Sequence, residues 1–391
     1  MTGADRAAVV VTGLGAVSSL GDGVDRLWNG LLQASAEPTP VPDGGRSSPP
    51  LVYRVTEDLP PVGPGGRSRF GRASALAARA VEQALAAAGL TAADRRDAGL
   101  TVGTTLGDID LVEPAGRQAG LPASAGGASF QVTEAVAARH GLGGPVLTMS
   151  TACSAGVYAV SWAAELIRSG DAEVVVACGT DGYSRVARAS LDRFGLLDDT
   201  RCRPFDADRQ GMVTGEGAAA LVLESASHAR RRGARSHATV LGDGWSCDAF
   251  HPTAPEPDGA QLRRAVAGAL AAAGALPGAV VLHRAGIPVN DVVESQVVAD
   301  QLGEAVGGVP AYGIKAVIGH TAGAAGAFGC VAAALILRHG VVPPNAHVRT
   351  LDPACPLAVP VGEAVPLPAP RVLVCATGFG GNNAAVVLGA P

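Results

Sequence analysis

Short apolar segments alternate with alanine-rich segments along the whole chain. The apolar segments have the length of strands and cover residues 7–13, 98–105, 145–151, 172–179, 217–224, 279–283 and 371–378. Because they are apolar on both faces, we expect them to be central strands of a buried sheet. Between them, "ASALAARAVEQALAAAGL", "GVYAVSWAAELIRSG" and "AQLRRAVAGALAAAGAL" have the composition of helices and carry glycine at or near their ends. This alternation predicts an α/β protein with helices layered on sheets.

The composition narrows the class of protein. Of the 391 residues, 48% are hydrophobic and 17% are charged, whereas about 25% are charged in a typical soluble protein. We therefore expect a large core or a buried subunit interface. The net charge of −5 gives no reason to expect binding to nucleic acid or to an anionic membrane. The seven cysteines contain no CxxC pair, which argues against a disulfide framework or a zinc site and favours a reduced, cytoplasmic protein.

Two apolar stretches raise the question of targeting or membrane insertion. At the N-terminus Asp5 offsets Arg6, so the basic region of a signal peptide is missing and a strand is expected instead. The stretch "AVIGHTAGAAGAFGCVAAALIL" is long enough to span a membrane, but it is rich in Gly and Ala and contains His320. We interpret it as a buried helix.

The stretch "STACSAG" contains the first candidate for chemistry, Cys153. It follows an apolar strand and precedes a helix, and this strand–turn–helix layout is how acyl-transfer nucleophiles are often presented. A thiol at a helix start has its pKa lowered by the helix dipole. On this motif alone, a buried structural cysteine remains the alternative.

The C-terminal third contains three more candidates. Of the 30 basic residues, 29 are arginine and one is Lys315, which indicates a site that requires a compact ammonium group. His320 lies five residues after Lys315, and His283 follows the apolar stretch "AVVL". A single histidine at a strand end is usually structural. Two of them, together with the only lysine and a candidate thiol, favour a catalytic site.

Six stretches together resemble the β-ketoacyl synthases, the condensing enzymes of fatty acid and type II polyketide synthesis in the thiolase superfamily. They are "VVVTGLGAVSSLG", "STACSAG", "RPFDADRQGMVTGEGAAALVLE", "DAFHPTAPEPDG", "KAVIGH" and "GFGGNNA", and they extend over essentially the whole chain. The resemblance implies a thiolase-like α/β fold whose two similar halves form a layered α-β-α-β-α core. Residues 1–245 would carry the nucleophile, and residues 246–391 would carry the histidines and the lysine.

The resemblance also implies a mechanism, that of a 3-oxoacyl-[acyl-carrier-protein] synthase. Cys153 would take an acyl group from an acyl carrier protein, and malonyl carrier protein would lose carbon dioxide. His283 and His320 would stabilise the resulting enolate, with Lys315 supporting the histidines. The backbone amides of Cys153 and Phe379 would form the oxyanion hole, and Phe379 would gate the acyl pocket.

Substrates and partners follow from the same resemblance. It implies substrate contacts at Thr253, Arg284 and Gly380, with substrates carried on the phosphopantetheine of the carrier protein. We expect no bound cofactor and no metal. The chain should form a homodimer, or a heterodimer with a related ketosynthase or chain-length-factor subunit.

The chain departs from the family around His283. The family pattern HGT-x-T reads "HRAGI" here, so Ala285 and Ile287 replace two threonines that would contact the pantetheine arm. Losing two neutral hydrogen bonds worth about 1–3 kcal/mol together should weaken carrier binding about tenfold or more. Arg284 replaces a glycine and is expected to put a bulky cation beside the site. Gly329 occupies a position where the family commonly has an acid.

These departures leave two alternatives to normal elongation. In one, the protein loads Cys153 but does not extend the chain, and acts as an acyltransferase. In the other, it is a non-catalytic partner subunit like the chain-length factors, although those usually lack the active cysteine. The basic run "HARRRGARSHA" at residues 228–238 either docks an acidic carrier protein or is a solvated helix end.

Overall fold

The computed structural model describes residues 8–41, 49–59, 62, 70–113 and 128–391. The strands of the N-terminal half are β1 (Val9–Ser18), β5 (Gly99–Gly103), β6 (Val146–Met149), β7 (Val174–Asp181) and β8 (Gly217–Ser225). Those of the C-terminal half are β9 (Ala238–Cys247), β10 (Ala279–Val281), β11 (Ala311–Tyr312), β14 (Arg371–Gly378) and β15 (Asn382–Gly389). Within the described residues these strands form one sheet, together with β2 (Gly21–Asp22) on β1. Two small two-stranded antiparallel sheets, β3 (Thr39–Pro40) with β4 (Leu51–Val52) and β12 (Val341–Val342) with β13 (Val365–Pro366), lie outside it.

The two halves of the sheet repeat the same arrangement. The first half has the order β1-β8-β7-β5-β6 and the second has the order β9-β15-β14-β10-β11. In each half the first two pairings are antiparallel and the last two are parallel. Antiparallel pairing of β1 with β9 joins the halves. The expected similarity of the halves is therefore confirmed. The expected boundary after residue 245 falls near the end of β9, and the division of the chain at that residue stays a prediction.

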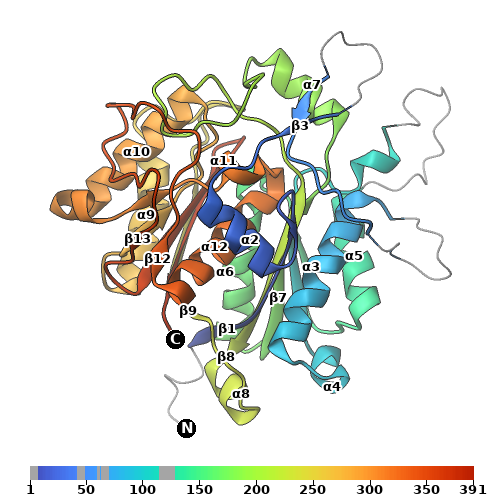
Figure 1. The fold of residues 1–391 in the computed structure, drawn as a ribbon. Helices are drawn as coiled ribbons and strands as arrows, with labels where there is room; N and C mark the ends of the chain where they lie inside the picture. Colours follow the sequence, from blue (N-terminus) through green and yellow to red (C-terminus); the bar gives the residue numbers. More distant parts are fainter. Residues whose placement is uncertain (1–7, 42–48, 60–61, 63–69, 114–127) are drawn as a thin grey trace.

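Helices cover both outer faces of the sheet and fill the space between its halves. α3 (Arg72–Ala88) and α5 (Ser129–His140) pack on the outer face of the first half. α6 (Ala155–Arg168) and α12 (Ala325–His339) lie between the halves, and α9 (Ala260–Ala273) and α10 (Pro288–Leu302) cover the second half. Figure 1 shows these layers from α3 and α5 on the right to α9 and α10 on the left. The order is α-β-α-β-α, as the resemblance implied.

The remaining helices are short or lie at the surface. They are α2 (Val24–Gln33), α4 (Ala92–Arg96), α7 (Arg185–Arg193), α8 (Ala226–Arg231) and α11 (Lys315–Ile318), with 3₁₀ turns η2 (Ile109–Leu111), η4 (Ala152–Ser154), η5 (Gly303–Gly308) and η6 (Ala322–Ala324).

The stretch that raised the membrane question is an interior helix. Within the described residues one helical segment, Ala322–His339, is long and apolar enough to cross a membrane, and 78% of it is buried in the protein. Its helix α12 packs against α6, β7, β8 and β14. The interpretation of this stretch as a buried helix is confirmed.

The strand β9 was not expected from the sequence, because glycines interrupt its apolar pattern. Gly242 and Gly244 face α9, and a Cβ atom at these positions would lie 2.5 Å from the Ala269 carbonyl and 2.2 Å from the Ala265 carbonyl. Such distances are far below van der Waals contact, so only glycine lets α9 approach this closely. All seven strands that were expected from apolar runs are present.

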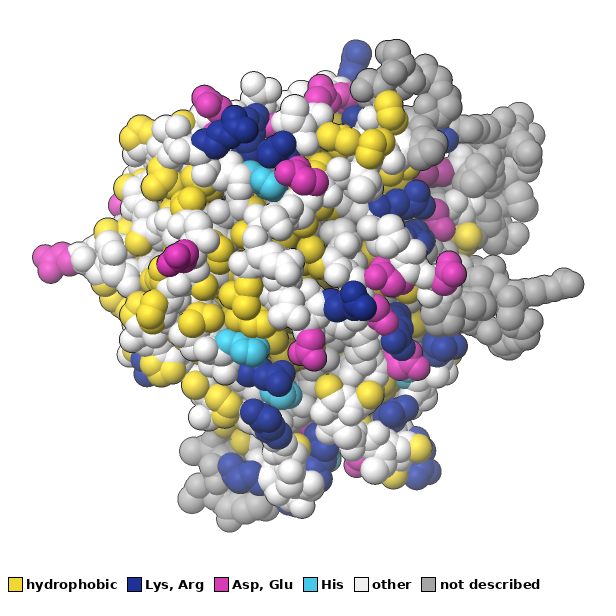
Figure 2. Space-filling view, viewed as in Figure 1, with side chains coloured by type: hydrophobic (Ala, Val, Ile, Leu, Met, Phe, Trp, Pro, Cys, Tyr) yellow, Lys and Arg dark blue, Asp and Glu magenta, His cyan; other side chains and the backbone are white. Residues whose placement is uncertain are grey.

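The basic run at residues 228–238 has acidic neighbours of its own. Arg231 pairs with Glu173 at 2.7 Å, and Arg232 and His228 both bind the buried carboxylate of Glu224. The run begins in α8, at the end of the molecule opposite α7 (Figure 1). These pairings favour the solvated helix end over a docking site. Figure 2 shows basic and acidic side chains interspersed over the face that it displays.

Candidate active site

The turn that contains Cys153 and the turn that follows His320 lie at matching places in the two halves. Cys153 belongs to the turn η4, which follows β6 and leads into α6. His320 lies two residues before the start of η6, which leads into α12. In both turns an alanine has a positive φ angle, 52° at Ala152 and 47° at Ala322. This left-handed conformation is disfavoured for a residue with a Cβ atom, and such strain often marks functional sites.

The other two candidates follow strands in the middle of the second half. His283 comes shortly after β10, and Phe379 follows β14, which is the neighbour of β10. Ends of parallel strands meet at one edge of a sheet, where ligands of α/β proteins usually bind. There, Cys153, His283, His320 and Phe379 line one cavity of about 370 Å³. Its remaining wall is mainly apolar and includes residues of α7.

Both histidines accept a hydrogen bond at Nδ1. The backbone N–H of Ala322 donates to His320 Nδ1 at 3.1 Å, and Lys315 Nζ lies 3.5 Å from His283 Nδ1. A neutral imidazole that accepts at Nδ1 carries its proton on Nε2, so these contacts assign both rings as Nε2–H donors. Burial, followed by the charge of Lys315, holds the pKa of both histidines well below the ordinary value. The site therefore holds two neutral donors.

The Cys153 thiol has a raised pKa. Burial raises its pKa to about 11, and the charge of Lys315 only partly offsets this effect. Hydrogen bonds from the backbone amides of Cys153 and Phe379 also lower the pKa. The amides at the helix start do lower the thiol pKa, but desolvation outweighs them and the net shift is upward.

Gly378 allows the backbone of β14 to reach the nucleophile turn. A Cβ atom at this position would lie 2.8 Å from the Thr151 carbonyl oxygen and 3.1 Å from the Cys153 nitrogen. The glycine thus lets the amide of Phe379 come up to the sulfur of Cys153. Amides that converge in this way can bind an oxygen that carries negative charge, and the oxyanion hole at Cys153 and Phe379 stays a prediction.

Lys315 is buried and is held on the backbone of His283. Its Nζ donates to the His283 carbonyl oxygen as well as lying near the ring. Burial lowers the pKa of Lys315, and the nearby Glu294 carboxylate raises it. The sequence reasoning did not include Glu294 in the site. The signal that could have found it is an acid on a helix that otherwise packs its apolar side on the sheet.

The structure corrects the expectation for Arg284. Its side chain is fully buried and does not line the cavity. The guanidinium stacks 4.3 Å above the Phe205 ring and binds residues of α10. The residue therefore does not place a cation beside the substrate, because its backbone directs the side chain into the core.

Thr253 and Gly380 also lie outside the cavity lining. The Thr253 amide donates to His251 Nδ1 at 3.1 Å, and the Gly380 amide donates to the Pro252 carbonyl at 2.8 Å. The second bond ties the 252–253 segment to the residue that follows Phe379. Direct contact of either residue with substrate stays a prediction.

The two residues that stand in place of the family's threonines do face the cavity. Ala285 and Ile287 line it, and both pack with Met212 in a small hydrophobic cluster. On α12, Gly329 lies against β14, where a Cβ atom would be 2.9 Å from Val374 Cγ1. An acidic side chain does not fit there without displacement of Val374.

The fold and this set of groups define a thiolase-like condensing enzyme. Family profiles match residues 6–229 as "Beta-ketoacyl synthase, N-terminal domain" and residues 237–349 as "Beta-ketoacyl synthase, C-terminal domain". The chain belongs to the β-ketoacyl synthase family, whose members are condensing enzymes of the acyltransferase type.

Individual relatives are similar over their whole length. The "Tetracenomycin polyketide synthase ketoacyl synthase alpha subunit" of Streptomyces glaucescens is 34% identical, with 98% of this chain and 97% of the relative covered. A solved structure, "The ishigamide ketosynthase/chain length factor", superimposes with a TM-score of 0.90 at 35% identity and covers 98% of this chain and 99% of that chain. A second, a "type II PKS acyl-carrier protein in complex with its ketosynthase bound to the hexaketide", gives a TM-score of 0.88 at 26% identity, again with 98% and 99% covered.

Proposed function

We propose that this protein is a β-ketoacyl synthase of a type II polyketide or fatty-acid-like pathway, which condenses an acyl group on Cys153 with malonyl carrier protein. The observation that supports this function best is the cavity shared by one thiol and two neutral Nε2–H donors. The thiol lies beside the amides of Cys153 and Phe379, and Lys315 holds the backbone of His283 by a hydrogen bond. The set matches the needs of both half-reactions.

In the first half-reaction Cys153 takes the acyl group from the carrier. Its sulfur attacks the thioester carbonyl, and the developing oxyanion accepts hydrogen bonds from the amides of Cys153 and Phe379. One such donor contributes about 3 kcal/mol in related acyl transfers. The carbonyl re-forms as the bond to the pantetheine sulfur breaks, and the proton lost by Cys153 ends on that sulfur.

In the second half-reaction the malonyl thioester loses carbon dioxide. The electron pair of the broken carbon–carbon bond forms an enolate, whose oxygen accepts hydrogen bonds from His283 and His320. The enolate carbon attacks the Cys153 thioester carbonyl, and the thiolate that leaves takes up a proton. Because the donors are neutral, they stabilise the enolate oxygen without protonating its carbon.

The substrates are carried on the phosphopantetheine of an acyl carrier protein, and the proposal requires no other cofactor. Ala285 and Ile287 offer the arm an apolar wall without hydroxyl groups. The pantetheine arm therefore binds here with fewer hydrogen bonds than the family's threonines would give. We place the protein in the cytoplasm, with its soluble biosynthetic relatives.

We further propose a dimer, with a second copy or a chain-length-factor subunit. Strand β6 ends the sheet order, and its Val146 is 42% exposed. On α6, exposed Trp162 stacks on Trp245 with ring centroids 5.5 Å apart. Unpaired edge strands and exposed aromatic side chains are features that soluble proteins usually cover.

The apolar replacements also support a second candidate, an acyltransferase that loads Cys153 without elongation. Intact mass spectrometry separates the candidates after incubation with acyl carrier protein and then malonyl carrier protein. Acylation of Cys153 followed by a ketoacyl product two carbons longer is the expected result, and Cys153→Ala should give neither.

The other outcomes are equally specific. Acylation without extension would establish the acyltransferase. No acylation, with candidate partner subunits added, would overturn both enzymatic functions and leave the role of a partner subunit.

A further inference from the structure

Arg284 occupies a position that is unfavourable for an arginine in two ways. Its φ angle is 33°, in the left-handed region that favours glycine, and its side chain is fully buried. A residue with a Cβ atom is strained in that region, and a buried charge needs close partners. An arginine at such a position indicates that its positively charged side chain makes local interactions that offset this cost.

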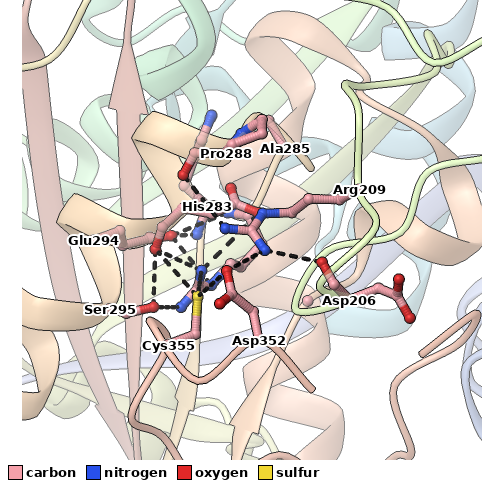
Figure 3. A network of polar contacts seen from close by, with 12 residues as sticks. Asp206, Arg209, His283, Ala285, Pro288, Glu294, Ser295, Asp352 and Cys355 are labelled. Carbon is pink, nitrogen blue, oxygen red and sulfur yellow. Dashed lines mark hydrogen bonds and ion pairs between the residues drawn. The ribbon is translucent and has the colours of Figure 1, made fainter. Parts of the chain in front are cut away.

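The guanidinium ties the residue after His283 to the first turns of α10. It donates to the Asp291 carbonyl oxygen at 2.6 Å and to Ser295 Oγ, and its Nε lies 3.7 Å from Glu294 Oε2. Figure 3 shows Glu294, Ser295 and Cys355 gathered in this network beside His283. The contacts come from several directions, so the side chain is fixed.

Glu294 is the link between this network and the catalytic histidine. One carboxylate oxygen accepts from the His283 amide at 2.7 Å, and the other accepts from the Arg284 amide at 3.1 Å. On the other side of the same residue, Lys315 Nζ binds the His283 carbonyl oxygen. The backbone of His283 is therefore held by the Glu294 carboxylate on one side and by the Lys315 ammonium group on the other.

Positively and negatively charged side chains lie next to one another in this region. Arg209 pairs with Asp291 at 3.3 Å and with Asp352 at 2.6 Å. Arg284 lies between two acids, 4.0 Å from Asp291 and 3.7 Å from Glu294, and Glu294 also faces Lys315. The charged and titratable groups that face Lys315 are Glu294, Asp291, Cys153, Cys202, His283 and His320. Without Arg284, Lys315 would be the main positive charge available to Glu294.

We propose that Arg284 is a positioning residue, which holds the Glu294 carboxylate on the His283 amide and leaves the Lys315 ammonium group free to support His283. Its catalytic consequence rests on the proposed condensation, in which His283 donates to the enolate. The guanidinium acts on decarboxylation through His283, and it has no part in loading Cys153.

The test compares four variants. Arg284→Met removes the charge but keeps much of the volume, and Arg284→Lys keeps the charge. Arg284→Gly relieves the backbone strain at φ 33° and leaves a space for added guanidinium ions. Arg232→Met is the matched control, because it removes a guanidinium from the buried Glu224 carboxylate far from the cavity.

The first measurement follows both half-reactions. We expect Arg284→Met to acylate Cys153 within about twofold of the unchanged protein and to decarboxylate malonyl carrier protein at least tenfold more slowly. Arg284→Lys should recover most of this loss, and guanidinium at millimolar concentration should partly restore Arg284→Gly, whereas urea at the same concentration should not. Arg232→Met should match the unchanged protein.

The second measurement does not depend on catalysis. Because Lys315 is the only lysine, the protein labelled with [ε-¹³C]lysine gives a single NMR signal whose pH titration reports this ammonium group. Without the Arg284 charge, Glu294 attracts the Lys315 ammonium group more strongly, so the pKa of Lys315 should rise in Arg284→Met and Arg284→Gly but not in Arg284→Lys or Arg232→Met.

Two results would overturn the inference. If the decarboxylation rate and the Lys315 titration stay unchanged in Arg284→Met and Arg284→Gly, Arg284 has no influence on the site. Equal losses in both half-reactions with an unchanged Lys315 titration would show a purely structural role. If the unchanged protein neither loads nor decarboxylates, the proposed function fails, and the Lys315 titration still decides the inference on Arg284.

Discussion

The imidazole rings of His283 and His320 meet edge to face, with centroids 5.4 Å apart and planes inclined at 78°. They come from different segments, one near β10 and the other before α12. Each ring accepts a hydrogen bond at Nδ1, so the two Nε2–H groups are the donors that remain for a ligand in the cavity. Both histidines should therefore act in their neutral form.

The neutral state of the histidines can be tested by the pH dependence of decarboxylation. An ordinary histidine titrates near about pH 6.5, but burial and Lys315 lower the pKa of His283 and His320 well below that value. We expect the decarboxylation rate to stay level from above pH 7 down through pH 6.5. A decline centred near pH 6.5 that is abolished by His320→Gln would contradict this assignment.

The reactivity of Cys153 should increase steeply with pH. Its pKa is about 11, so the thiolate fraction rises about tenfold per pH unit between pH 7 and 9. The rate of alkylation by iodoacetamide, followed by intact mass, should rise in the same proportion. Lys315→Met should lower this rate, since the ammonium group favours the thiolate. A rate that levels off near pH 8 would show that the charges and amides outweigh burial.

Gly378→Ala should damage acylation specifically. The added Cβ atom would press on the Thr151 carbonyl and the Cys153 amide, which displaces the oxyanion-binding amides. Loss of one oxyanion donor lowers the rate by about 10²–10³-fold. Stopped-flow or quenched acylation assays measure this effect, and circular dichroism checks the fold.

Gly268→Ala on α9 is the matched glycine control. There the nearest atom is 3.8 Å from the new Cβ atom, an ordinary contact, so neither acylation nor the fold should change. If Gly378→Ala acylated Cys153 as fast as Gly268→Ala does, the close approach of β14 would not matter for the reaction.

Ala285→Thr combined with Ile287→Thr should strengthen carrier binding. Both positions line the cavity, so hydroxyl groups there can meet the pantetheine arm. Two hydrogen bonds of about 0.5–1.5 kcal/mol each predict a KM for malonyl carrier protein that is about tenfold lower, with little change in kcat. Ile287→Val is the control for the loss of a methyl group alone. An unchanged KM would mean that the arm does not pass these residues.

Asp181 should destabilise the protein as the pH rises through 6. Burial raises its pKa to about 6, although four donors from Thr104, Thr105, Leu106 and Gly323 lower it. The folded state thus favours the protonated acid. Its stabilising contribution is complete below about pH 4 and is lost as the pH passes 6, by about 3 kcal/mol.

Chemical denaturation of the unchanged protein and of Asp181→Asn between pH 4 and 7 measures this contribution. The difference in free energy of unfolding should shift in favour of the variant as the pH rises. A difference that is constant over this range would contradict a raised pKa.

The sequence by itself determined the α/β class, seven strands of the sheet, the interior position of α12 and the residues that meet at the cavity. The class, the strands and α12 follow from local patterns, because runs of Val, Ala and Leu exclude water on both faces of a strand. The site residues follow from the resemblance of six motifs to the β-ketoacyl synthases, and the small residues around Cys153 leave room for a sulfur. β9 escaped this reasoning, because Gly242 and Gly244 break its apolar run for the sake of close packing against α9.

Only the tertiary structure decided the direction of Arg284 and the ionisation of Cys153. Arg284 follows His283 in sequence, but its partners are an aromatic ring at Phe205, a helix that starts at Pro288 and a loop at Cys355. The Cys153 pKa depends on how completely segments from both halves enclose the sulfur. Desolvation and contacts between distant residues have no signature in the local pattern, so side-chain direction and pKa emerge only when the two halves pack together.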